Sequence, residues 1–396
     1  MSKAVAVTGM GIISAIGNST EANYKSLASE KQGISFPEIL KTAHKNLPVG
    51  EIKMSNKALA SLLNLRDNHS FTRASLLGAL AVKEAIENAK IKIDKHTGFI
   101  SGTSVGGMDA TEKYFKEFTH GKVENKQFIR AQHPGFTTEK IAEYFRITGF
   151  VTTISTACSS GANAIMLGAR MIQAGKLKRV IVGGTDCLTK FTLNGFNSLM
   201  ILSENHCKPF DQNRNGLNLG EGAAYLVLEA EKEINGKPVL GRVSGYGNAN
   251  DAFHQTASSE NGEGAFLAMQ KALKSAGISS EEIDYINAHG TATKNNDNAE
   301  SVALKRIFSN KLPDFSSTKA FTGHTLAAAG ALEAVFSLLS LQHQQVFPNL
   351  NFSESMESSG LVPVTKMKEK SMEYVLSNSF GFGGNCTSLI FSKNGD

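Results

Sequence analysis

The sequence predicts an α/β fold, in which strands and helices alternate along the chain and form layers around mostly parallel central strands. Short apolar runs rich in β-branched residues alternate with longer segments of helical periodicity. The chain has 396 residues, enough to bury a large core, and only eight prolines with no Pro- or Ser-rich linker. Alternation without a dividing linker is typical of layered α/β proteins.

The first expected strand begins close to the start of the chain. Its apolar run, Val5-Ala6-Val7, also raises the possibility of a signal peptide, but glycines interrupt the run and only one basic residue precedes it. We therefore expect a strand there. The expected strands are residues 4–8, 97–102, 150–155, 179–184, 224–229, 239–246, 283–288, 315–320, 373–378 and about 387–392.

The expected helices lie between these strands. The most apolar of them, near 326–343, is interrupted by Gly330 and Glu333, and its apolar part falls short of the ~20 residues that a bilayer requires. It is predicted to be a core helix, so no membrane span is expected. The expected helices are residues 70–90, 136–145, 159–174, 262–276, 296–309 and 326–343.

Composition excludes several classes of protein. The four cysteines, at irregular spacing, predict neither a disulfide framework nor a metal site, and free thiols fit a reducing cytoplasm. A net charge of +5 without a Lys/Arg block gives no indication of nucleic-acid binding. We hypothesise that a basic surface patch docks an acidic partner protein. The candidate residues are Lys57, Arg66, Arg73, Lys208 and Arg214.

Cys158 is the first candidate functional residue. It follows the expected strand 150–155 and precedes a segment built of Ala, Gly and Ser that reads as a buried helix. Free N–H groups and the positive dipole end at a helix N-terminus lower a thiol's pKa and can bind an oxyanion. A structural cysteine in the core is the alternative, and this segment alone does not decide between them.

Two histidines favour the functional interpretation. His289 follows the expected strand 283–288, and His324 follows the expected strand 315–320 after a turn that also contains Lys319. One cysteine with distant histidines is the layout expected of an enzyme with a nucleophilic thiol. Cys158 and His324 also each precede an Ala/Gly-rich helix, which suggests that the two halves of the chain are duplicates that meet at the site.

Four segments in the same order resemble the β-ketoacyl-acyl carrier protein synthases of the elongating type, within the thiolase superfamily. They are TACSSGANAI, NAHGTATKNNDNAE, STKAFTGHTLAAAGALEA and NSFGFGGN, and the resemblance runs from Val5 to Phe391. It implies a thiolase-like fold of two pseudo-symmetric halves, residues 1–235 and 236–396, in five α-β-α-β-α layers. It also implies that an insertion at about 103–135 forms a dimer interface and closes an acyl tunnel.

The resemblance assigns a role to each motif residue. Cys158 accepts the acyl group, and the backbone N–H groups of Cys158 and Phe382 form the oxyanion hole. His289 and His324, as neutral imidazoles, stabilise the enolate left by decarboxylation. Lys319, counted with the catalytic residues, pairs with Glu333 for support and proton handling, and a plain structural ion pair is the alternative. The other supporting residues are Thr291 and Thr293 for the pantetheine amides, and Asp297 and Glu300, which order the loop by capping the helix near 296–309.

The chain departs from the family pattern at two places near the pocket mouth. Asn215 and Leu217 stand where the family usually has Asp and Phe, and Asn385-Cys386 replaces Thr-Asn after the Gly-Phe-Gly-Gly segment. These departures put gating and chain preference in doubt. A thiolase would carry a second catalytic cysteine near Cys386, but Lys319 and the paired histidines favour the synthase.

The resulting expectation is a cytoplasmic acyltransferase that condenses an acyl-enzyme with malonyl-acyl carrier protein in fatty acid biosynthesis. It would need no cofactor or metal of its own, since phosphopantetheine arrives on the carrier. Acyl carrier protein is the expected partner, with a homodimer or a heterodimer with a chain-length factor as the assembly. A ketosynthase of aryl polyene or polyketide pigment synthesis is the alternative, and a non-catalytic chain-length factor is disfavoured by Cys158.

Overall fold

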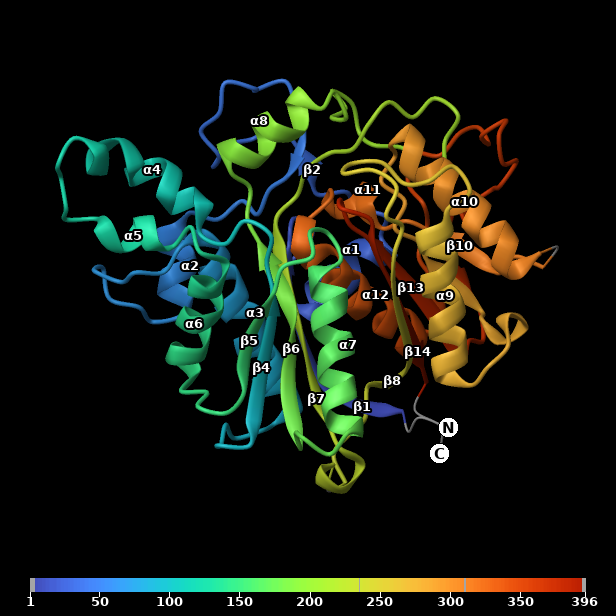
Figure 1. Cartoon of the computed structure of the whole chain (residues 1–396), viewed down its shortest axis with the longest axis horizontal. Helices are drawn as coiled ribbons and strands as arrows, with labels where there is room; N and C mark the ends of the chain where they lie inside the picture. Colours follow the sequence, from blue (N-terminus) through green and yellow to red (C-terminus); the bar gives the residue numbers. More distant parts are fainter. Residues whose placement is uncertain (1–3, 235, 310, 394–396) are drawn as a thin grey trace.

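The computed structural model describes residues 4–234, 236–309 and 311–393, and it shows an α/β fold around a large central sheet (Figure 1). In that part of the chain ten strands form one sheet, in the order β10-β9-β13-β14-β8-β1-β7-β6-β4-β5. These strands are β1 Val5–Ser14, β4 Thr97–Gly102, β5 Val151–Ile154, β6 Arg179–Asp186, β7 Gly222–Glu229, β8 Gly241–Asn250, β9 Tyr285–Asn287, β10 Asp314–Ser316, β13 Tyr374–Phe380 and β14 Asn385–Ser392.

Helices and short strands complete the fold. Two small sheets pair β2 (Ile34–Ser35) with β3 (Val49–Gly50) and β11 (Gln345–Val346) with β12 (Lys368–Glu369). The helices are α1 Thr20–Ala28, α2 Asn56–Leu62, α3 Arg73–Ala89, α4 Met108–Thr119, α5 Lys126–Arg130, α6 Pro134–Phe145, α7 Ser160–Gln173, α8 Lys190–Ser198, α9 Glu263–Ala276, α10 Lys294–Phe308, α11 Lys319–Thr322 and α12 Ala329–His343, with 3-10 turns η1 Glu231–Glu233, η2 Ser280–Glu282 and η3 Leu326–Ala328.

The two halves of the large sheet have the same topology. β1-β7-β6-β4-β5 and β8-β14-β13-β9-β10 each place the first strand of the half beside its last, and each ends in two parallel pairings. The halves join where β1 pairs with β8. This correspondence is what duplication of one five-stranded α/β unit would produce.

The helices α7 and α12 lie between the two halves of the sheet. α7 packs on β4 and β6 and also touches β8 and β14, whereas α12 packs on β13 and β7. α3 covers the outer face of β1 and β7, and α9 covers β8 and β14, which gives the five layers of a thiolase-like fold (Figure 1). The Ala/Gly composition of the central helices follows from this close packing: a Cβ on Gly330 would lie 2.9 Å from the Ala162 Cβ.

Several element predictions need correction. The expected strand 315–320 ends at Ser316, and Lys319–Thr322 forms the short helix α11, because periodicity cannot distinguish a short apolar strand from a buried helical turn. The sequence reasoning did not identify α1, α2, α4, α5 or α8, and two of these, α4 and α5, lie within the expected insertion 103–135. Leu326–His343 is apolar and long enough to cross a membrane, but 89% of this window is buried inside the fold, as in a core helix.

Candidate active site

Cys158 lies at a sharp turn between β5 and α7. Ala157 adopts a left-handed conformation (φ +51°), and α7 begins at Ser160, two residues beyond the cysteine. The turn that follows β13, Gly381–Gly384, lies directly against this point, and we call it the gate turn. A Cβ on Gly381 would come within 2.8 Å of the Thr156 carbonyl oxygen, so glycine is what lets the gate turn lie against the cysteine.

The thiol of Cys158 lies near the two expected backbone donors, its own N–H and that of Phe382. The expectation of a lowered thiol pKa is nevertheless wrong. Complete burial raises the pKa of Cys158 to about 12, and this outweighs the opposing effects of Lys319 and of the two N–H groups. The resting nucleophile is therefore a neutral thiol.

His289 and His324 lie together at the other side of the site. His289 follows β9, His324 follows α11, and their ring centroids are 5.4 Å apart in an edge-to-face arrangement. Each residue is only 2% exposed. Burial, followed by the positive charge of Lys319, holds both histidine pKa values well below the usual 6.5, and for His289 the neighbouring His324 adds to this. Both rings are neutral at physiological pH.

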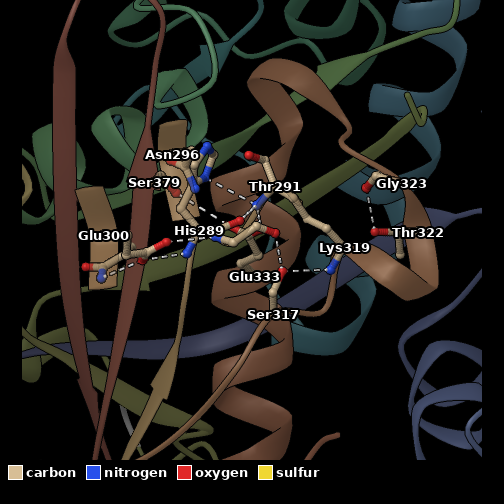
Figure 2. Close-up of polar contacts among 12 residues, drawn as sticks. His289, Thr291, Asn296, Glu300, Ser317, Lys319, Thr322, Gly323, Glu333 and Ser379 are labelled. Carbon is tan, nitrogen blue, oxygen red and sulfur yellow. Dashed lines mark hydrogen bonds and ion pairs between the residues drawn. The ribbon is translucent and has the colours of Figure 1, made fainter. Parts of the chain in front are cut away.

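Lys319 fixes one of these rings. Its Nζ lies 3.2 Å from Nδ1 of His289 and donates to the His289 carbonyl oxygen at 2.6 Å, and it forms a buried ion pair with Glu333 (Figure 2). Because Lys319 donates to Nδ1, the proton of the neutral imidazole resides on Nε2, where it can be offered to a ligand. The pair predicted between Lys319 and Glu333 is thus present.

Glu300 and Asp297 hold the loop that carries His289. The Glu300 carboxylate accepts from the N–H groups of His289 (2.9 Å) and Gly290 (2.8 Å); Figure 2 shows Glu300 beside His289. Asp297 accepts from the Thr291 N–H at 3.0 Å. Both residues therefore order the loop, but not by capping: they lie inside α10 and bind the preceding loop, whereas Thr293 occupies the N-cap position without a side-chain capping bond to the helix.

One pocket of about 460 Å³ brings the predicted residues together. Its lining includes Cys158, His289, Thr291, Thr293, His324, Phe382 and Cys386. Asn215 and Leu217, the departures at the mouth, also line it. Lys319, Glu333, Asp297 and Glu300 support the pocket from outside its lining.

The sequence did not lead us to two further residues at this site, Phe196 in the pocket lining and Asp186 behind it. Phe196 of α8 stacks on Phe382 with ring centroids 5.6 Å apart, so the gate ring has an aromatic partner. Asp186, buried at the end of β6, accepts from the Ser104 N–H and the Ala327 N–H, both at 3.0 Å, and thereby connects segments from the two halves. Asp186 is a polar residue at the end of an apolar strand, and this pattern in the sequence could have identified it.

The structure corrects the hypothesis of a basic docking patch. Arg73 is buried and bound through two nitrogens to Glu221, at 2.6 and 2.8 Å. Arg214 is also buried, beside Asp297. Neither side chain is available to an incoming partner. Lys57 and Arg66 are exposed and Lys208 is half-buried, so a docking role for these three residues stays a prediction.

The fold and the residues of this site are those of a condensing enzyme, and the comparisons with known proteins agree. The β-ketoacyl synthase N-terminal domain model matches residues 2–233, and the C-terminal domain model matches residues 240–353. The chain belongs to the β-ketoacyl synthase family.

Individual relatives extend over nearly the whole chain. A putative mitochondrial 3-oxoacyl-(acyl-carrier-protein) synthase of Schizosaccharomyces pombe is 34% identical, covering 99% of each chain. The 3-oxoacyl-(acyl-carrier-protein) synthase 2 of Vibrio cholerae is 33% identical, covering 98% of this chain and 99% of its own.

Solved structures show the same relationship. The ishigamide ketosynthase/chain length factor aligns over 100% of both chains with a TM-score of 0.94 and 28% identity. A ketosynthase in complex with its chain length factor from Xenorhabdus doucetiae aligns over 98% of both chains, with a TM-score of 0.85 and 32% identity.

Proposed function

We propose that this protein is a β-ketoacyl-acyl carrier protein synthase that joins an acyl chain to malonyl-acyl carrier protein by decarboxylative condensation. One observation supports this most strongly. A single pocket presents a cysteine thiol beside two backbone N–H donors and, facing it, two neutral histidines 5.4 Å apart. These groups correspond to the two half-reactions of a condensing enzyme.

The first half-reaction is acyl transfer to Cys158. The sulfur attacks the thioester carbonyl of the acyl carrier, and the tetrahedral oxyanion lies between the N–H groups of Cys158 and Phe382. The carrier's thiol leaves, and it takes the proton that the cysteine loses. Because the thiol is neutral at rest, its deprotonation is coupled to the attack.

The second half-reaction uses the histidines. His289 and His324 donate hydrogen bonds from Nε2 to the malonyl thioester carbonyl, whose oxygen becomes negative as the C–C bond to the carboxylate breaks and CO₂ leaves. The enolate carbon then attacks the acyl-Cys158 carbonyl. The C–S bond breaks, the product is a β-ketoacyl carrier two carbons longer, and the departing Cys158 thiolate takes up a proton from solvent.

The substrate arrives on a carrier protein, as the names of the relatives state for those proteins. The hydroxyls of Thr291 and Thr293, 2.9 Å apart in the pocket lining, are suited to hydrogen-bond the amides of the carrier's phosphopantetheine arm. The protein needs no resident cofactor or metal in this scheme, and a cytoplasmic location is part of the proposal.

Mass spectrometry of Cys158 tests this function directly. After incubation with a panel of acyl carrier proteins bearing different acyl chains, the parent protein gains the mass of the preferred acyl group on the peptide containing Cys158. The Cys158→Ala variant gains nothing. Absence of an acyl group on the parent with every carrier contradicts the proposal.

A pathway-specific ketosynthase that works with a chain-length factor is the second candidate. The near-complete alignments with ketosynthase/chain length factor structures favour it, as do the departures at Asn215, Leu217, Asn385 and Cys386. Condensation by the isolated homodimer supports the first candidate, and activity only with an added partner subunit supports the second. Cys158 in a pocket with both histidines disfavours a non-catalytic subunit.

A further inference from the structure

We propose that Asn385 is a positioning residue for acyl transfer. Its side-chain oxygen ties the gate turn to the helix that follows Cys158, and this link sets the spacing of the two oxyanion donors. The inference rests on the proposed function, because it concerns how the oxyanion hole of that reaction is held.

Asn385, the first residue of β14, directly follows the gate turn. The Gly381 N–H donates to the Asn385 carbonyl oxygen at 2.8 Å, and the Gly384 N–H donates to the Gly381 carbonyl oxygen at 3.1 Å. The backbone between these residues is therefore a closed turn. Any restraint on Asn385 is transmitted to Phe382, which is three residues away within that turn.

The Asn385 side chain is bound to the opposite side of the site. Its Oδ1 accepts from the Ser159 hydroxyl and from the Asn163 amide, both at 2.8 Å, and from the Asn248 amide at 2.9 Å. Ser159 directly follows Cys158, and Asn163 lies on the next turn of α7. One oxygen thus connects the segment of the nucleophile to the gate turn.

The donors around this oxygen are themselves fixed. Asn163 also donates to the Thr156 hydroxyl at 2.9 Å and accepts from the Thr387 hydroxyl at 2.8 Å. Ser159, Asn163 and Thr387 are buried, and the Ser159 hydroxyl also donates to the Thr156 carbonyl oxygen at 2.7 Å, so protein groups rather than water hold these side chains in place. The network therefore holds a single arrangement of the gate turn against α7.

This side-chain link joins the gate turn to α7, and the Phe382 N–H of the same turn lies beside the Cys158 thiol. The other polar contacts of the gate turn lead outward: Gly383 donates to the Gln255 carbonyl oxygen at 2.8 Å and accepts from the Asn250 amide at 3.1 Å. The Phe382 ring stacks on Phe196 of α8. Because the two oxyanion donors come from separate segments, their spacing depends on the inner link through Asn385.

Three variants test the proposal. Asn385→Ala removes the acceptor, Asn385→Asp keeps an oxygen in its place, and Asn250→Ala is the matched control that loosens only the outer side of the gate turn. Each is compared with the parent for single-turnover acylation of Cys158 from an acyl carrier, for decarboxylation of malonyl carrier, and for its melting temperature.

We expect Asn385→Ala to slow acylation of Cys158 about tenfold or more. A displaced N–H donor stabilises the oxyanion less well, and its effect on the rate approaches that of removing the donor. Decarboxylation, which depends on His289 and His324, should stay within about twofold of the parent rate. Asn385→Asp should recover most of the acylation rate, and Asn250→Ala should leave it within about threefold.

Acylation of Asn385→Ala at the parent rate overturns the inference. An equal fall in the rates of both half-reactions that Asn385→Asp does not reverse also overturns the inference, because such a fall indicates a general loss of stability. If Asn385→Ala does not fold, Asn385→Leu replaces it under the same expectations, since it also removes the acceptor but keeps a side chain of similar shape. A stable parent that is never acylated refutes the proposed function itself, and the two failures are thereby distinguished.

Discussion

Cys158 is subject to opposing electrostatic effects, and burial prevails. Lys319 and the two backbone N–H groups stabilise a thiolate, yet removal of the thiol from water raises its pKa to about 12. A neutral thiol in an enclosed site resists oxidation and reacts with a substrate whose binding brings it against the oxyanion donors. The position of the cysteine was predictable from sequence, but its ionisation was not.

This ionisation state gives a pH prediction. A raised pKa keeps the thiolate fraction small at neutral pH, and that fraction grows about tenfold per pH unit until the pKa is reached. The rate of Cys158 alkylation by iodoacetamide, followed by peptide mapping, should therefore keep rising from pH 7 to beyond pH 9. Cys158→Ala identifies labelling of the other three cysteines. A plateau below pH 9 would show an ordinary or lowered thiol pKa.

The histidines should act on only one half-reaction. Replacing His289 or His324 by Ala removes a donor to the developing enolate oxygen, so malonyl decarboxylation should fall about 100- to 1000-fold. Acylation of Cys158 should change far less, because backbone donors serve that oxyanion. Both rates are measured on each purified variant. Decarboxylation at the parent rate in both variants would refute this assignment of roles.

At the scale of elements, the ends of strands and the turns after them carry the chemistry, and the central helices hold them in place. α12 contributes Glu333 to Lys319 of α11, and α10 contributes Glu300 to the loop after β9. These long-range pairs explain why an apolar helix contains a buried glutamate. If the Lys319–Glu333 pair is only structural, its variants should lose stability alone. If the pair also supports His289, its variants should lose decarboxylation activity as well.

Breaking the ion pair from one side should be more harmful than removing both partners. Glu333→Leu leaves the Lys319 charge buried and unpaired, which should lower the free energy of unfolding by about 3–5 kcal/mol. Lys319→Met with Glu333→Leu should recover most of that loss in denaturant titrations. Decarboxylation should stay low in the double variant because the donor to His289 Nδ1 is gone. A double variant with parental decarboxylation would make the pair structural only.

The gate turn gives a second prediction at this scale. Phe382 is half-buried and stacked on Phe196, so it is a movable ring between glycines rather than a core residue. Phe382→Ala should leave the pocket open, and malonyl decarboxylation without condensation should rise relative to product. Phe196→Ala, which removes the partner ring, should shift the ratio the same way. A lower melting temperature with an unchanged ratio would mean that Phe382 only packs.

At the scale of the whole molecule, local patterns predicted the fold because alternation and the four motifs extend along the chain. The same patterns placed Cys158, His289 and His324 correctly in one pocket. The predictions that failed concern residues whose partners lie far away in the sequence. Arg73 seemed a free surface charge, but its partner Glu221 lies 148 residues further on. Likewise, the cost of burial at Cys158 is set by layers that close over it from both halves.

Product analysis of Cys158→Ala tests the central claim, that one pocket performs acyl transfer through the cysteine and decarboxylation through the histidines. The parent and the variant are given acyl and malonyl carrier proteins, and released CO₂ and β-ketoacyl carrier are both quantified. The parent should yield CO₂ and product in equal amounts. The variant, with an unchanged fold by circular dichroism, should release CO₂ from malonyl carrier but form no product. Product formation by the variant near the parent rate would contradict the account.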